Sequence, residues 1–297
     1  MKDIVTASRS LVLPAMQQHP NYMRALRAMG AGGHVLCEEG GTSAQVITRR
    51  IGPLRLNWVA RGPLFQGEGD RAKHLAAMLG DLPGCTFALP DRAEETPVFR
   101  KAGFCALGTA QEVAELDLTP AEAARLAAQH GKWRNRLRHA QAGPVVITHS
   151  PYEPRRDAPL LTLEVAQRRS RRYLALPTDF CHAWAATNPK ATRLFRADGP
   201  EGFLAFVLIL LHAPTASYHI GWTGAAGRKT SAHNLLLWQA SNWLASRGYL
   251  RLDLGGIDRI KAPGLARFKL GSGATAHAIG PLMGRLPGPL RRICPAR

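Results

Sequence analysis

Residue pairs with metal-ligand or disulfide spacing are missing from this chain of 297 residues. Its five cysteines are scattered without a Cys-x-x-Cys pair, which argues against a disulfide framework and a structural zinc site. Its 11 histidines form no His-x-x-x-His pattern, so we predict no metal. Long apolar runs are also lacking. The longest, residues 203–211, suits a buried strand and is too short to cross a bilayer.

Acidic residues are scarce, since 21 Asp and Glu stand against 39 Lys and Arg, for a formal net charge of +18. This excess predicts an anionic partner: a nucleotide-linked precursor, tRNA, the pyrophosphate of acyl-CoA or an acidic lipid surface. The alternative is an arginine-rich surface that serves solubility alone. The first residues lack a signal-peptide core, so we expect a cytoplasmic protein, with peripheral contact at the inner membrane left open. The proline- and arginine-rich stretch 281–297 reads equally as a disordered tail or as a contact with anionic membrane.

The chain is long enough for one large domain or for two of about 150 residues each. Residues 1–118 read as short helices and strands, with three strands between 35 and 59 separated by glycine turns, which predicts an antiparallel meander. A helix start follows at Thr119-Pro120-Ala121-Glu122, where Thr119 can cap the helix and Glu122 completes a capping box. We expect one linking helix over about 119–142 and place the domain boundary along it.

From about residue 144 the pattern of helices, meander, further helix and strand starts again, which indicates a weak internal duplication. Strands are predicted at 145–148, 192–196, 202–211, 217–223, 250–254 and after Gly273, and helices at 160–174, 178–187 and 231–247. The fold class predicted is therefore α/β (α+β), with mixed, mostly antiparallel sheets flanked by helices. We divide it into domains 1–130 and 131–297.

The most informative stretch is 216–273, which reads as a strand, a glycine-bearing turn, an amphipathic helix, a second strand and a basic aromatic motif. A strand, a glycine turn and a helix in this order can hold a phosphate or a carbonyl oxygen on free backbone N–H groups. The order indicates a group-transfer enzyme.

Five segments, taken in order, carry a resemblance to a known family: Lys132–Arg138, Tyr218–Gly224, Ala232–Trp238, Asp253–Gly256 and Arg267–Gly271. Together they resemble the Fem family, the peptidoglycan-bridge aminoacyltransferases and their Gram-negative relatives. The resemblance implies two tandem GNAT-like acyltransferase domains and acyl transfer onto an amine. Characterised bridge-forming members take the amino acid from aminoacyl-tRNA. The coiled-coil arm of some members has no counterpart here, because no pair of long heptad helices occurs.

Lys269 and Asp253 are the predicted catalytic residues. Acyl transfer develops an oxyanion, and a cation beside it is worth roughly 3–4 kcal/mol. Lys269 lies in the Phe-Lys motif that the resemblance associates with catalysis; the alternative is a surface lysine on an edge strand. Asp253 ends a strand before two glycines and would act as a base or orient Lys269, whereas the alternative is a turn cap. Asp258 is a weaker candidate.

Cationic and polar residues near these motifs are the predicted binding residues, because guanidinium groups match phosphate oxygens. The set is Arg134, Arg138, Arg228, His233, Asn234, Arg267, Tyr218 and Trp222. Lys132 and Arg136 share a helix with the first two, the Arg168–Arg172 group is similar, and Lys229 adjoins Arg228. The alternatives are a solvated helix face for the two helical arginine groups, helix capping for His233 and Asn234, and core packing for Tyr218 and Trp222.

The sequence thus predicts an N-acyltransferase that moves an aminoacyl or acyl group to an amine on an anionic cell-envelope precursor. The first domain would bind the acceptor and the second would carry the chemistry. No tightly bound cofactor is expected, and aminoacyl-tRNA and acyl-CoA are the candidate co-substrates. Two alternatives stay open: an acyl-CoA-dependent GNAT enzyme acting on a polysaccharide or small-molecule amine, and a non-catalytic basic binding protein.

Overall fold

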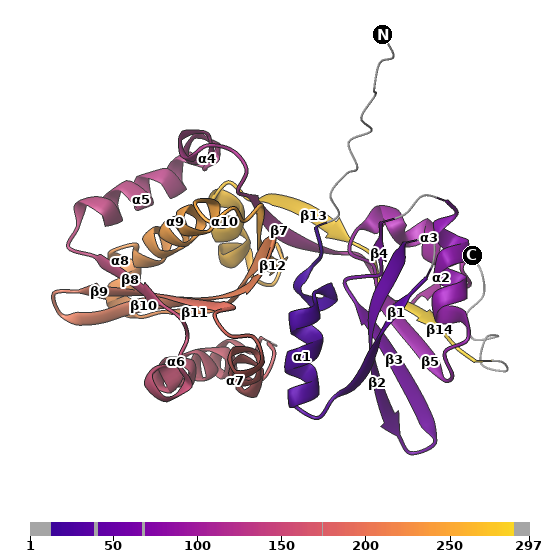
Figure 1. Ribbon diagram of the computed structural model, residues 1–297. Helices are drawn as coiled ribbons and strands as arrows, with labels where there is room; N and C mark the ends of the chain where they lie inside the picture. Colours follow the sequence, from indigo (N-terminus) through magenta and orange to yellow (C-terminus); the bar gives the residue numbers. More distant parts are fainter. Residues whose placement is uncertain (1–12, 39–40, 67–68, 174, 288–297) are drawn as a thin grey trace, which may run out of the picture.

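The computed structural model describes residues 13–38, 41–66, 69–173 and 175–287. Within these ranges the chain forms two seven-stranded mixed sheets, each flanked by helices (Figure 1). The predicted fold class is confirmed. Most of the proline- and arginine-rich stretch, from 288 to 297, lies outside the described residues, as does the N-terminal segment 1–12.

The first sheet has the strand order β1-β2-β3-β5-β14-β6, and β4 pairs with β2. Strands β1, β2 and β3 form the predicted antiparallel meander. The strands are β1 (Gly32–Cys37), β2 (Thr42–Ile51), β3 (Leu54–Ala60), β4 (Leu64–Phe65), β5 (Cys85–Leu89), β6 (Cys105–Ala106) and β14 (Met283–Arg285). The helices are η1 (Met16–Gln18), α1 (Pro20–Ala28), α2 (Arg71–Gly80), η2 (Ala93–Glu95) and α3 (Thr96–Lys101).

The second sheet has the order β13-β7-β12-β11-β10-β9-β8. Its strands are β7 (Gln111–Asp117), β8 (Val146–Ser150), β9 (Thr192–Gly199), β10 (Gly202–His212), β11 (Thr215–Thr223), β12 (Arg251–Ile257) and β13 (Thr275–Ile279). Its helices are α4 (Glu122–Ala128), α5 (Gly131–Ala142), α6 (Pro154–Arg171), α7 (Thr178–Thr187), α8 (Ala225–Lys229), α9 (Ala232–Ala245) and α10 (Pro263–Gly271). Helices α5, α9 and α10 cover one face, and α6 and α7 cover the other (Figure 1).

Apolar periodicity explains this layering, because each element buries its apolar side against the sheet. Strand β10 is apolar on both faces and almost wholly buried, as its run of leucine, valine, isoleucine and phenylalanine predicts. Trp133, Leu137 and Ala140 of α5 pack with Leu236 of α9 on one side of the sheet. The second sheet is therefore a central layer with a hydrophobic core on each face.

The two sheets share a design that fits the predicted duplication. In the first, β3 and β5 run parallel and are connected through α2; in the second, β11 and β12 run parallel and are connected through α8 and α9. The other strand pairs of both sheets in the described ranges are antiparallel. Each half thus contains a strand, a crossover helix and a parallel strand.

The single linking helix predicted over 119–142 is wrong. Residues Gln129 and His130 are extended, and the helix is broken there into α4 and α5. The predicted capping box does not form, because the backbone N–H and hydroxyl of Thr119 both bond to a carboxylate oxygen of Asp117. His130 instead donates its backbone N–H to Gly271 O at 3.0 Å, which fixes α5 beside α10.

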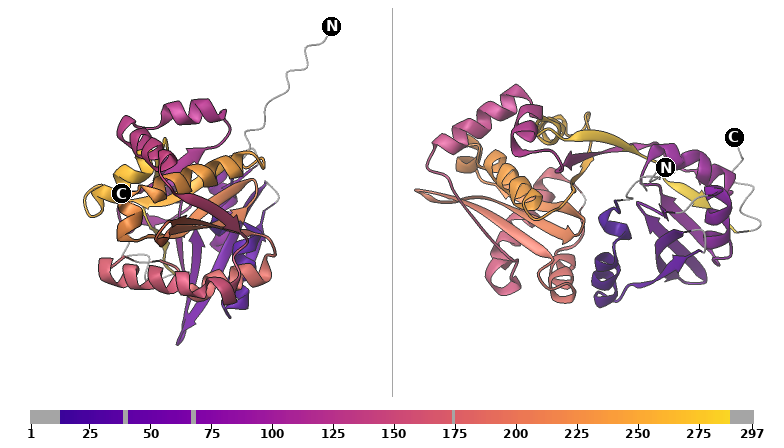
Figure 2. Two further views of the ribbon diagram at one scale, coloured as in Figure 1. Left: turned by 90° about the vertical axis from the view of Figure 1, so that its left-hand side faces the viewer. Right: turned by 45° about the horizontal axis from the view of Figure 1, so that its top comes forward.

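Strands β7 and β14 take places in the sheets that local sequence patterns did not indicate. Strand β7 lies between β12 and β13 of the second sheet, although it precedes the predicted boundary at residue 130. After β13 the chain returns to the first sheet, where β14 pairs with β5 and β6 (Figures 1 and 2). The boundary at 130 stays a prediction for independently folding units. The chain itself passes from the first sheet to the second after β6 and back to the first after β13.

Candidate active site

Parallel strands β11 and β12 part from each other in the middle of the second sheet. They pair only at Thr215–Arg251, Ala216–Leu252 and Ser217–Asp253, although both strands continue beyond these pairs. Where they part, the register of β12 against β7 shifts, and Gly255 adopts a φ of 76°, which favours glycine. The parting opens the sheet and leaves a strand edge that an extended ligand can approach.

A pocket of ≈ 730 Å³ opens at this point. Strands β11 and β12 and helices α5, α6, α8, α9 and α10 contribute to its wall. Its cationic lining residues are Arg136, Arg171, Arg228, Lys229 and Lys269, and no carboxylate of the described residues lines it. The volume suits a small-molecule ligand, and the charge favours an anionic one.

Lys269 lies on α10 and faces this pocket, with 9% of the residue exposed. The predicted alternative, a surface lysine on an edge strand, is therefore wrong. Its Nζ donates to Gly256 O at 2.7 Å, just past the bulge in β12. Burial lowers the pKa of Lys269 to about 8, while the charge of Asp253 opposes this shift. The amine is thus close to losing its proton in the neutral range.

His233 is hydrogen-bonded through both ring nitrogens. Its Nε2 lies 2.9 Å from the hydroxyl of Tyr218 and its Nδ1 lies 2.7 Å from the hydroxyl of Thr223. Burial lowers the pKa of His233 to about 4, and it raises the pKa of the Tyr218 hydroxyl. A neutral imidazole has one donor and one acceptor nitrogen, so this chain can move a proton by reversing its hydrogen bonds.

Asn234 and the start of α9 supply further hydrogen-bond donors. The Asn234 side chain is buried at the pocket wall, and its Nδ2 has no partner among the described residues. Ser231 precedes the helix with a φ of 55° and makes no side-chain cap, so the first N–H groups of α9 are not capped by it. A helix N-terminus of this kind favours a negative charge.

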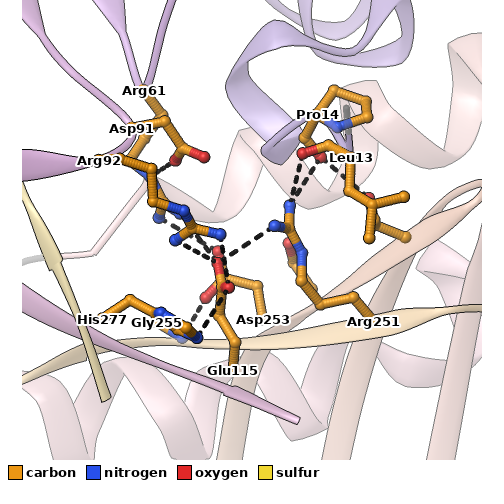
Figure 3. A network of polar contacts seen from close by, with 12 residues as sticks. Leu13, Pro14, Arg61, Asp91, Arg92, Glu115, Arg251, Asp253, Gly255 and His277 are labelled. Carbon is orange, nitrogen blue, oxygen red and sulfur yellow. Dashed lines mark hydrogen bonds and ion pairs between the residues drawn. The ribbon is translucent and has the colours of Figure 1, made fainter. Parts of the chain in front are cut away.

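Asp253 lies behind Lys269 and outside the pocket lining. One carboxylate oxygen accepts from the backbone N–H of Gly255 at 2.6 Å, and the other lies 3.2 Å from Nη1 of Arg61 (Figure 3). The bond from Gly255 is the turn cap given as the alternative for Asp253, and the two catalytic roles predicted for it stay predictions. Asp258, the weaker candidate, is exposed and accepts from the backbone N–H groups of Ile260 and Lys261, outside the pocket lining.

Four predicted binding residues are not part of the pocket wall. Arg134 bonds the carbonyl of Ala127 from the surface of α5, and Arg138 and Arg267 are exposed. The ring of Trp222 stacks on Phe203 with centroids 5.5 Å apart, which fits core packing. The structure does bring Tyr218, Arg228, His233 and Asn234 together with Lys269, and their roles stay predictions.

The sequence singled out neither Thr223 nor Gln167 at the pocket, and it named Arg171 only as one of a group. Thr223 ends β11 and bonds His233, and Gln167 of α6 donates to Gly221 O at 3.3 Å. Arg171 faces the pocket, whereas Arg168 of the same cluster pairs with Glu164. Arg168 and Arg171 are three residues apart on α6 and therefore lie on the same side of the helix. Their spacing alone did not indicate which of them faces the pocket.

Comparison with known proteins identifies the family. Residues 110–275 match the family described as Acetyltransferase (GNAT) domain, over more than half of the chain. The chain belongs to the GNAT acyltransferases. The match begins just before β7 and ends at the first residue of β13, so it covers the second sheet apart from the rest of β13, and the whole pocket. The chain is an acyltransferase, and the predicted enzyme class is confirmed.

Solved structures show the same fold over most of the chain. FemX is 12% identical with a TM-score of 0.78, covering 96% of each chain. A tandem GNAT protein from the clavulanic acid biosynthesis pathway is 11% identical with a TM-score of 0.52, covering 86% of this chain and 84% of that one. L-PGS from Bacillus licheniformis is 12% identical with a TM-score of 0.51, covering 97% and 99%. The predicted resemblance to the Fem family is thus confirmed at the level of the fold.

No curated protein matches the chain significantly. In the described ranges, no helix is both long and apolar enough to traverse a bilayer.

Proposed function

We propose that this GNAT protein moves an aminoacyl or acyl group from an activated ester or thioester to an amine, at the pocket around Lys269. The acceptor we propose is an anionic cell-envelope precursor that carries the amine. One observation supports the proposal above the others: a buried lysine with a lowered pKa faces a pocket lined by cations where two strands part.

The residues of the pocket match what the reaction needs. When the amine attacks the donor carbonyl, a C–N bond forms, the C–O or C–S bond to the carrier breaks, and an oxyanion develops between the two events. The protonated Lys269 would stabilise that oxyanion. The amine must also lose a proton, and the leaving oxygen or sulfur must gain one. The Tyr218–His233–Thr223 chain would carry that proton.

Both candidate donors carry phosphate groups at a distance from the acyl group. Arg136, Arg171, Arg228 and Lys229 would bind these phosphates, together with the N-terminus of α9. This shared chemistry supports aminoacyl-tRNA and acyl-CoA equally. The match to an acetyltransferase family is a separate reason to test acyl-CoA as the alternative donor.

Calorimetric titration separates the donors. The purified protein is titrated with acetyl-CoA, with long-chain acyl-CoA, and with charged and uncharged tRNA pools, at low and moderate salt. Tight binding of charged tRNA alone supports aminoacyl transfer, and saturable acyl-CoA binding supports the alternative. If both tRNA forms bind alike and lose their affinity with salt, the net charge alone explains the tRNA binding and aminoacyl-tRNA is ruled out as the donor. The proposal as a whole fails if acyl-CoA does not bind either.

The role of Lys269 is tested in turnover with the donor that binds. We expect Lys269→Met to lower kcat at least tenfold, since removal of one oxyanion partner costs about 100- to 1000-fold in known cases. Lys261→Met is the control, because Lys261 is exposed and outside the pocket. An unchanged rate in Lys269→Met would refute the assignment.

The pH dependence shows in which form Lys269 acts. Arginine stays protonated, so the ratio of the wild-type rate to the Lys269→Arg rate isolates the titration of Lys269, because the acceptor amine titrates in both proteins. If the ammonium form stabilises the oxyanion, this ratio falls as the pH rises through about 8. A ratio that rises instead would make Lys269 a base.

A further inference from the structure

Arg61 is a buried arginine of the first sheet that reaches into the second. It follows β3, is 5% exposed, and has a φ of 51°, in the left-handed region that non-glycine residues rarely adopt. Its guanidinium binds three carboxylates (Figure 3). Nε bonds Asp91, Nη1 lies 3.2 Å from Asp253, and Nη2 lies 3.4 Å from Glu115. Two of these carboxylates, those of Asp253 and Glu115, belong to strands of the second sheet.

A continuous series of short contacts leads from Arg61 to the pocket. Arg61 binds one oxygen of Asp253, and the other oxygen accepts from the N–H of Gly255 at 2.6 Å. This bond holds the bulge where β12 leaves its regular register. The carbonyl of the next residue, Gly256, accepts from Nζ of Lys269 at 2.7 Å. The position of Arg61 therefore helps to fix the carbonyl that holds the lysine.

We propose that Arg61 is a positioning residue for Lys269, acting through Asp253 and the β12 bulge. The first sheet then completes the site of the second, even though no residue of the first sheet lines the pocket. Its effect on the reaction rests on the function proposed above, whereas its effect on the lysine itself does not. The two are therefore separable by experiment.

The charges along this path predict the direction in which the pKa of Lys269 changes in each variant. Asp253 favours the charged form of Lys269, and Arg61 offsets the charge of Asp253. Removal of the Asp253 charge should lower the pKa of Lys269, and removal of the Arg61 charge should raise it. The other titratable groups facing the pocket are Arg136 on α5, Arg171 on α6, Tyr218 on β11, Arg228 and Lys229 on α8, and the neutral His233 on α9. They stay the same in every variant.

Arg92 provides a matched control. It also comes from the first sheet and also binds Glu115, with its Nη2 2.8 Å from a carboxylate oxygen. No described contact joins it to Asp253. A purely structural role for these arginines would make Arg61→Met and Arg92→Met behave alike, whereas a positioning role makes only Arg61→Met change the titration of Lys269.

The experiment measures the reactivity of Lys269 itself, without any donor or acceptor. Isotope-coded acetic anhydride labels the full-length protein from pH 6 to 10, and mass spectrometry follows the peptide that carries Lys269. Only the neutral amine reacts. We expect labelling at pH 7 about two- to threefold slower in Arg61→Met and two- to threefold faster in Asp253→Asn, with Arg92→Met close to wild type.

A compensated variant keeps the test informative if Arg61→Met does not fold. Arg61→Met combined with Asp91→Asn removes one buried cation and one buried anion, and leaves Asp253 charged. It should label more slowly, as the single variant does. An unchanged pKa of Lys269 in this variant, or the same change in Arg92→Met, would overturn the proposal. If the wild-type protein transferred no acyl group from any donor, the proposed function would be refuted, but the labelling result for Lys269 would still stand.

Discussion

Glu115 and Glu112 lie on the same strand, β7, and both pair with arginine, but one pair is buried and the other is exposed. The Glu115 side chain is 4% exposed. Its carboxylate lies within 3.5 Å of the guanidinium groups of Arg61, Arg92 and Arg251 and 3.6 Å from Nε2 of His277 (Figure 3). Glu112 is 40% exposed and pairs with Arg259 at 2.9 Å. Replacing each by glutamine preserves shape and removes one charge. The two variants therefore isolate the effect of burial.

From the structure we expect the two substitutions to lower the free energy of unfolding by very different amounts. Glu115→Gln leaves Arg61, Arg92 and Arg251 around a neutral amide in a site with little water. Removal of one partner from a buried pair costs about 3–5 kcal/mol, because the remaining charge is not compensated. The exposed pair at Glu112 is worth about 0–1 kcal/mol. We expect the free energy of unfolding to fall about 3 kcal/mol further in Glu115→Gln than in Glu112→Gln.

Urea unfolding and thermal unfolding, both followed by circular dichroism, measure the difference. In a chain of this size each kcal/mol corresponds to about 2 °C in Tm, so Glu115→Gln should melt about 6–10 °C below wild type. Glu112→Gln should stay within about 2 °C of wild type. Equal losses in the two variants would show that the cations around Glu115 do not depend on its charge, and that the network is not a stabilising junction.

Two further changes test the first sheet. Burial, with a smaller contribution from Asp91, raises the pKa of Glu95 to about 7. The folded state therefore holds more protons than the unfolded one between about pH 4.5 and 7, and stability falls as the pH rises through that range. Glu95→Gln should lose this dependence, so that its Tm relative to wild type is higher at pH 8 than at pH 5; parallel curves would contradict the burial argument. Gly84→Ala should cost at least about 2 kcal/mol, since the φ of 90° is strained for alanine and the added Cβ would lie 2.1 Å from the carbonyl oxygen of Arg55. Gly103→Ala, with a φ of 86° but nothing within 4 Å, should cost only the strain of about 1 kcal/mol, and equal losses in chemical denaturation would rule out the clash.

Local patterns were enough to predict much of the fold. The apolar run of β10 and the glycine turns of the first meander identify strands because burial and turn chemistry act within a few residues. The helix predicted at 231–247 closely matches α9 for the same reason. By contrast, the break at Gln129 and His130 depends on a bond to Gly271, which lies far along the chain. A capping signal at Thr119 could not indicate that contact.

Strand pairing between distant segments was beyond the reach of the sequence. Strand β7 pairs with β12 and β13, and β14 pairs with β5 and β6. Each of these four pairs brings together segments more than 100 residues apart. The sequence supplies the strands, but only the assembled sheet selects their neighbours. The same limit explains why the short strand β14 was missed, since it has few residues and little alternation.

The residues of the candidate site likewise divide into those that local sequence indicated and those that depend on long-range contacts. Lys269, His233 and Tyr218 lie in segments whose order resembles the Fem family, and the structure brings them to one pocket. Arg61 and Glu115 carried no local signal. Their partners lie between 23 and 192 residues away in the sequence, so these ion pairs cannot be inferred from spacing as they can on one helix.

The buried charges and the strand crossings occupy the same place in the molecule. Glu115 and His277 lie on β7 and β13, the two strands by which the chain enters and leaves the second sheet. Arg61 and Arg92 reach Glu115 from the first sheet, so rotation of one sheet against the other would separate buried ion pairs. Such a separation would leave charges unpaired in a site with little water, which is costly. The junction that holds the two sheets together therefore also holds Asp253, and through it the bulge beside Lys269, in a fixed position.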